Sequence, residues 1–69
     1  MPYIDAYALL QNPNCSAIDL LNCFEELAME YGYIAGTVKR GIRSREAETD
    51  LVRMFMLLEI MKIRIQQKL

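Results

Sequence analysis

The C-terminal third of the chain, residues 51–69, limits the fold most, because its apolar residues form two separate stripes. An ordinary surface helix, at 100° per residue, has one apolar stripe that faces its core. The first stripe here, together with one residue upstream, consists of Ala47, Leu51, Met54, Phe55, Leu58, Met61, Ile65 and Leu69. The second stripe consists of Val52, Met56, Ile60 and Ile63. One stripe can be buried within so short a chain, so the second predicts a contact with another molecule.

The second stripe could be covered in three ways. The sequence predicts a homodimer first, in which Val52, Met56, Ile60 and Ile63 form the interface of a helical bundle. A groove for a different protein is the next alternative, and methionine side chains suit an adaptable face. The third is that the N-terminal segment covers the stripe, although its few apolar residues suffice for one end only. In the dimer, a charged residue at Met56 or Ile60 would dissociate the subunits.

The chain is predicted to be all-α and to form a single small domain over residues 1–69. Residues 2–12 read as a short helix that Pro13 stops. Ser16 can cap a long helix over residues 16–40, whose apolar residues share one arc of about 140°. Ser44 can cap another over residues 44–68, after the short turn at Gly41. Short connections join antiparallel neighbours, so the long helices should form a hairpin preceded by the short one.

Composition excludes several classes of protein. The chain has no histidine and only two cysteines, Cys15 and Cys23, so no metal or cofactor site is expected. If both lie near one helix, about 12 Å separates them, beyond the roughly 7 Å that a disulfide spans. We expect reduced thiols and a cytoplasmic protein. The longest uncharged apolar run, residues 54–58, is far below the roughly 18 residues of a membrane span. No signal peptide is expected either.

Charge is distributed unevenly along the chain. Residues 1–38 carry five acidic side chains and no basic one, whereas residues 39–69 carry all eight basic side chains and four acidic ones. A basic cluster at the hairpin turn consists of Lys39, Arg40, Arg43 and Arg45. It could contact nucleic acid or an acidic protein, or it could be a solvated turn whose charges complement the helix dipoles.

Residues 24–43, FEELAMEYGYIAGTVKRGIR, resemble the helix-turn-helix pattern of DNA-binding proteins. Leu27 and Ala28 match its apolar and small positions, Gly32 its turn, and Val38 and Ile42 the core of its recognition helix. The resemblance implies that the residues facing DNA are Ala35, Gly36, Lys39, Arg40 and Arg43. The apolar phase continues across Gly32, however, which favours a single helix.

Small residues recur every fourth position at Ala28, Gly32 and Gly36. On a continuous helix this spacing leaves a shallow strip where another helix could approach. The glycines could equally be tolerated flaws, or mark a kink.

Nothing in the sequence points to catalysis. It contains no phosphate-binding glycine loop and no nucleophile beside a base. We therefore expect a non-catalytic regulator, adaptor or inhibitor that acts through helix-mediated protein contacts and self-association. The alternative is a small DNA-binding transcriptional regulator.

Overall fold

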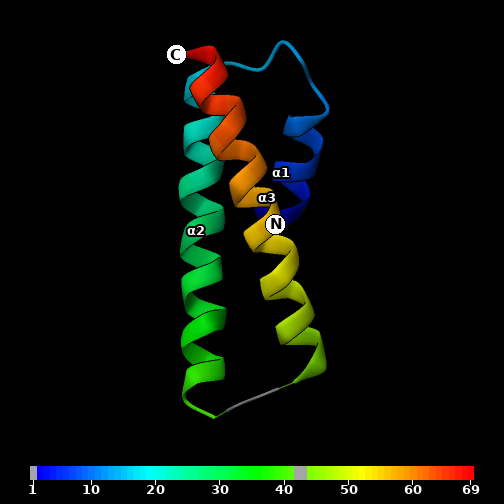
Figure 1. Cartoon of the computed structure of the whole chain (residues 1–69), viewed down its shortest axis with the longest axis vertical. Helices are drawn as coiled ribbons and strands as arrows, with labels where there is room; N and C mark the ends of the chain where they lie inside the picture. The colour runs from blue at the N-terminus through cyan, green and yellow to red at the C-terminus, as the bar shows by residue number, and fades with distance from the viewer. Residues whose placement is uncertain (1, 42–43) are drawn as a thin grey trace.

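Two long antiparallel helices form the body of the molecule, and a short N-terminal helix packs beside them (Figure 1). The structure is a computed structural model that describes residues 2–41 and 44–69. Within these ranges the helices are α1 (Pro2–Leu10), α2 (Ala17–Lys39) and α3 (Arg45–Lys68). The molecule measures 40 by 17 by 17 Å. The predicted all-α hairpin preceded by a short helix is confirmed.

Side-chain caps set the ends of the two long helices. The Ser16 hydroxyl accepts a hydrogen bond from the Asp19 amide at 3.0 Å, and the Ser44 hydroxyl accepts one from the Ala47 amide at 3.0 Å. Each cap satisfies an amide that has no partner within its own helix. Gly41 follows α2 with a φ of 93°, a left-handed conformation that glycine adopts readily. The two long helices begin and end within one residue of the predicted ranges, 16–40 and 44–68, because those ranges included the capping residues.

The short helix α1 ends at Leu10, before the predicted limit at residue 12. The Asn12 amide instead bonds the Leu9 carbonyl at 3.1 Å, a tighter three-residue turn. Pro13 explains the early end, because a proline disfavours the helical conformation in the residue before it. The Asn12 side chain then accepts a hydrogen bond from the Asn14 amide at 3.0 Å, which stabilises the turn.

The core lies between the two long helices and beneath α1. Its buried residues are Ala6, Cys15, Leu20, Cys23, Leu27, Met54, Leu57, Met61 and Ile65. Most agree with the arcs expected from the sequence, but α3 is rotated relative to the prediction. Leu57, outside both predicted stripes, is buried, whereas Phe55 of the first stripe is 54% exposed. The reason is that α1 packs along one flank of α3, which buries Leu57 and leaves Phe55 on the opposite flank uncovered.

The far end of α3 is tied to the loop between α1 and α2. The Lys68 ammonium donates a hydrogen bond to the Pro13 carbonyl at 3.2 Å. Leu69, assigned to the first stripe, lies beyond the helix and is 88% exposed. No helix within residues 2–41 and 44–69 combines the length and apolar character that a membrane crossing requires.

Candidate interaction surfaces

The second stripe of α3 is exposed over its whole length. The exposed fractions are 61% for Val52, 58% for Met56, 47% for Ile60 and 55% for Ile63. These side chains share the outer side of α3 because Met54, Met61 and Ile65 on the inner side are buried. The alternative in which the N-terminal helix covers the stripe is therefore not what the structure shows. The stripe is open to a partner.

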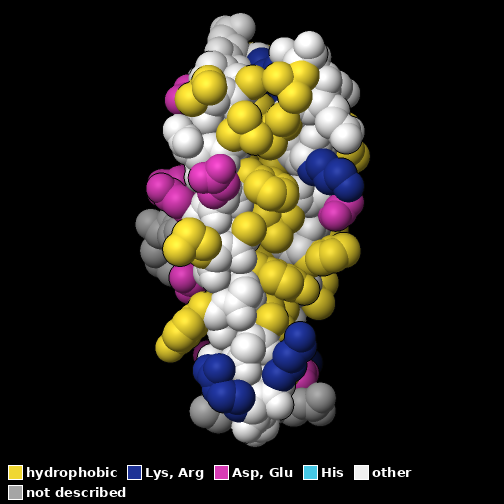
Figure 2. All heavy atoms as spheres, turned by 90° about the vertical axis from the view of Figure 1, so that its left-hand side faces the viewer, with side chains coloured by type: hydrophobic (Ala, Val, Ile, Leu, Met, Phe, Trp, Pro, Cys, Tyr) yellow, Lys and Arg dark blue, Asp and Glu magenta, His cyan; other side chains and the backbone are white. Residues whose placement is uncertain are grey.

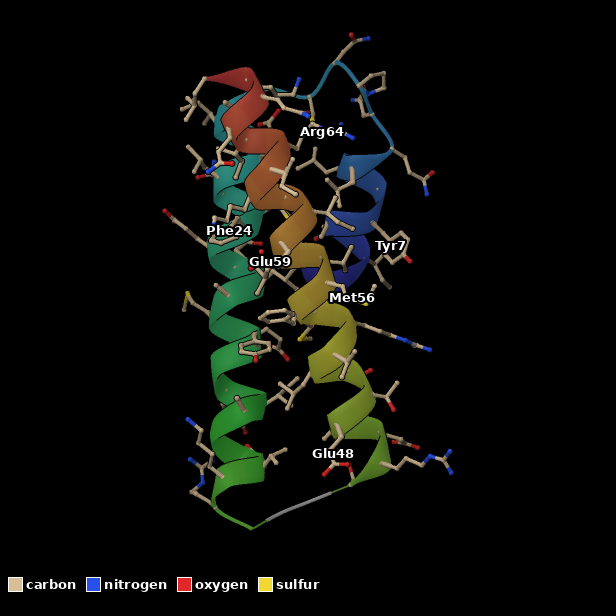
Figure 3. All side chains as sticks on the ribbon, viewed as in Figure 1. Tyr7, Phe24, Glu48, Met56, Glu59 and Arg64 are labelled. Carbon is tan, nitrogen blue, oxygen red and sulfur yellow. The ribbon has the colours of Figure 1, made fainter. Side chains whose placement is uncertain are left out.

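An open hollow of about 370 Å³ lies where α1 meets the second stripe. It is lined by Tyr7, Arg53, Met56, Leu57 and Ile60. Tyr7 is 52% exposed, and Figure 3 shows Tyr7 on α1 and Met56 on α3, both on the side of the molecule away from α2. The hollow could receive one apolar side chain of a partner, with the Arg53 guanidinium beside it. The sequence does not connect Tyr7 with this surface, because only the packing of α1 brings Tyr7 there.

A second apolar surface follows the groove between α2 and α3, and we call it the seam face. It is formed by Leu21, Phe24, Ala28 and Tyr31 of α2 and by Phe55 and Leu58 of α3. Figure 2 shows apolar side chains gathered in a band along the length of the molecule. The Tyr31 and Phe55 rings contact across the groove with centroids 6.5 Å apart. The sequence feature that indicates this surface is the broad apolar arc of α2. The arc is wider than the part of α2 that α1 and α3 cover.

The basic cluster lies at the hairpin end of the molecule. Lys39 is the last residue of α2, Arg40 is its C-cap and Arg45 begins α3, so these three lie at the same end of the molecule, whereas Arg43 lies outside the described residues. Acidic residues lie next to the basic ones on α3. A shallow hollow there is lined by Arg45, Glu46, Thr49, Asp50 and Arg53. The cluster is therefore of mixed charge on its α3 side.

The two-helix geometry of the helix-turn-helix resemblance is absent from α2. Residues 17–39 form one helix, which passes through Gly32 without a turn (Figure 1). Gly32 is exposed, and a Cβ atom placed on it would meet nothing within 4 Å. The strip at Ala28 and Gly32 therefore lies open at the edge of the seam face.

Cys15 and Cys23 are both buried thiols. Burial raises the pKa of the Cys23 thiol, and the carboxylates of Asp5 and Glu26 raise it further. A raised pKa keeps the thiol protonated near neutral pH, whereas nucleophilic or metal-binding cysteines need the thiolate. Among the residues that the structure describes, no three potential metal ligands are grouped together.

Comparisons of the chain with protein-family models, with curated proteins and with solved structures gave no match. The surfaces described above are therefore the basis for a functional proposal.

Proposed function

We propose that this protein is a non-catalytic regulator, adaptor or inhibitor that acts through helix-mediated contacts with proteins, including copies of itself. The observation that carries the proposal is the exposed second stripe on α3. Val52, Met56, Ile60 and Ile63 are each about half exposed or more, and they lie on a long helix anchored by a buried core. Together with the hollow beside Tyr7, which Arg53 also lines, they form an exposed surface rich in apolar side chains.

The stripe can contribute useful binding energy. Burying an aliphatic side chain fully is worth about 1.5–3 kcal/mol, so covering the exposed half of each residue gains roughly 1 kcal/mol. Four such residues and Tyr7 would supply on the order of 5 kcal/mol, against the cost of immobilising two molecules. A partner that also reaches Arg53 with a carboxylate would add a charge-assisted hydrogen bond. This favours an amphipathic helix with an acidic edge as the ligand.

Affinity capture with matched baits tests the proposal. The baits are the wild-type chain, Met56→Glu, Ile60→Glu and the control Met29→Glu, since Met29 is 77% exposed on the far side of α2. We expect a partner protein to bind the wild type and the control with similar affinity. It should bind the two stripe variants at least tenfold more weakly in titrations with purified material. Equal binding by all four baits would contradict the proposal.

DNA binding is the alternative function, and the position of Lys39, Arg40 and Arg45 at one end of the molecule supports it. It predicts that a labelled duplex binds at low salt and dissociates steeply as salt rises, because phosphate contacts release counterions. Replacing Lys39 and Arg40 by glutamine would abolish that binding. The continuous α2 offers no separate recognition helix, so we rank this function second.

The proposal places the protein in the cytoplasm. Its support is that Cys15 and Cys23 are both thiols in the structure, as proteins of a reducing compartment usually have. Fractionation of cells with an antibody against the chain would test this location.

A further inference from the structure

The seam face carries a charge pattern that is complementary to itself. Gly32 follows Tyr31 on α2, and the Tyr31 ring lies 6.5 Å from the Phe55 ring of α3, so Gly32 and Phe55 lie within about one helical turn of each other along the molecule. Glu25 lies seven residues before Gly32, and Lys39 lies seven residues after it. Seven residues is two helical turns, about 10 Å, so both lie on the same side of α2 as Gly32.

The same spacing recurs on α3. Glu48 precedes Phe55 by seven residues, and Lys62 follows it by seven. Because α2 and α3 are antiparallel (Figure 1), Glu25 lies within about one helical turn of the height of Lys62, and Lys39 lies within about one turn of the height of Glu48. An acidic residue on one helix is therefore near the height of a basic residue on the other at both ends of the apolar band.

We propose that the seam face binds a second copy of this chain, related by a twofold axis parallel to the helices. This deepens the proposed function, on which it rests, by naming the surface used for self-association. In this dimer α2 of each subunit lies on α3 of its partner at the same height. Glu25 then pairs with Lys62 of the partner subunit, and Lys39 pairs with Glu48 of the partner subunit. The second stripe remains open for a different protein.

Shape supports this orientation of the subunits. Phe55 is 54% exposed, and a Cβ atom placed on Gly32 would meet nothing within 4 Å, so the surface of α2 at Gly32 is open to a ring of the partner subunit. The parallel axis places a Phe55 ring over a Gly32 on both sides of the interface. An axis perpendicular to the helices would instead place α2 on α2 and α3 on α3 of the partner subunit. Gly32 would then face Gly32 on one side of the interface, and Phe55 would face Phe55 on the other. That arrangement forces unequal helix spacings, whereas close packing prefers spacings of about 8–10 Å.

Two double variants of unchanged net charge test the proposal by sedimentation over a wide concentration range. The first, the α2 swap, combines Glu25→Lys with Lys39→Glu, and the second, the α3 swap, combines Glu48→Lys with Lys62→Glu. The proposed dimer has two α2–α3 contacts with two charge pairs each, and either swap places like charges opposite each other in all four pairs. Each variant alone should therefore dimerise at least about tenfold more weakly than the wild type. An equimolar mixture should dimerise like the wild type, because the reversed α2 of one chain then meets the reversed α3 of the other.

The perpendicular arrangement gives a different result. There α2 lies on α2 of the partner, so Glu25 faces Lys39 and the α2 swap preserves both pairs. An α2 swap that dimerises like the wild type would therefore overturn the proposed axis. Circular dichroism of each variant shows whether the helices are retained, and restoration in the mixture can come only from folded chains.

Single substitutions separate this proposal from the proposed function. Phe55→Ala and Gly32→Leu should weaken dimerisation, and Met56→Glu should leave it unchanged. A wild-type chain that stays monomeric overturns the seam dimer, yet capture of a partner that depends on Met56 would still support the proposed function. Conversely, a dimer that responds to the swaps, with no ligand dependent on Met56, would support the seam dimer and overturn the role of the second stripe.

Discussion

Replacing Gly32 by alanine should stabilise the folded chain, and the structure determines both the sign and the size of the effect. Gly32 lies inside α2 without a left-handed φ, and its Cβ position is open. The new methyl group therefore meets no steric penalty and gains no burial. What remains is the difference in helix propensity, which favours alanine over glycine by about 1 kcal/mol.

For a domain of this size, that gain should raise the melting temperature by about 4–8 °C. Thermal unfolding followed by circular dichroism measures it, at a concentration at which sedimentation shows only monomer. Gly41→Ala is the matched control with the opposite sign, because Gly41 has a φ of 93° that costs an alanine about 1 kcal/mol or more.

A lower melting temperature for Gly32→Ala would refute this reasoning. It would mean that Gly32 adopts a conformation reserved for glycine, as the turn of a helix-turn-helix motif requires. The same experiment therefore tests whether α2 is one helix in solution.

Three further substitutions test the core, a cap and a buried thiol. Leu27→Ala should cost about 2–5 kcal/mol in urea unfolding because Leu27 is fully buried, whereas Met29→Ala, at an exposed position of the same helix, should cost almost nothing. Ser44→Ala should cost about 0.5–2 kcal/mol through loss of the hydrogen bond to the Ala47 amide, and Ser44→Asp, which restores an acceptor, should recover most of it. In a Cys15→Ser background, alkylation of Cys23 should reach half its maximum rate at a higher pH in the folded chain than in urea. Because folding raises this pKa, the thiol stabilises the folded state below its ordinary pKa, and that contribution should fall as pH rises toward the folded value. Cys23→Ser should remove this part of the pH dependence, and equal alkylation profiles in the folded and unfolded chains would contradict the assignment.

The residues of the seam face could be predicted from the sequence only in part. The apolar arc predicted for residues 16–40 includes Phe24, Ala28 and Tyr31, and the spacing of Ala28 and Gly32 indicated a strip open to another helix. Their exposure could not be derived, because it depends on where α1 lies. A short helix with an apolar residue on almost every side can pack on either flank of a hairpin, and its own sequence does not choose between them.

The sequence by itself determined the helices, their ends and the existence of a surplus apolar stripe. Serine caps, Pro13 and Gly41 act on residues within one turn, and the phase of apolar residues follows from 3.6 residues per turn, so these features are local. The tertiary structure alone decided that α1 covers Leu57 instead of Phe55, and that Tyr7 and Met56 line the same hollow. Those outcomes depend on how three apolar surfaces compete to exclude water, and that competition is settled only when the helices pack together.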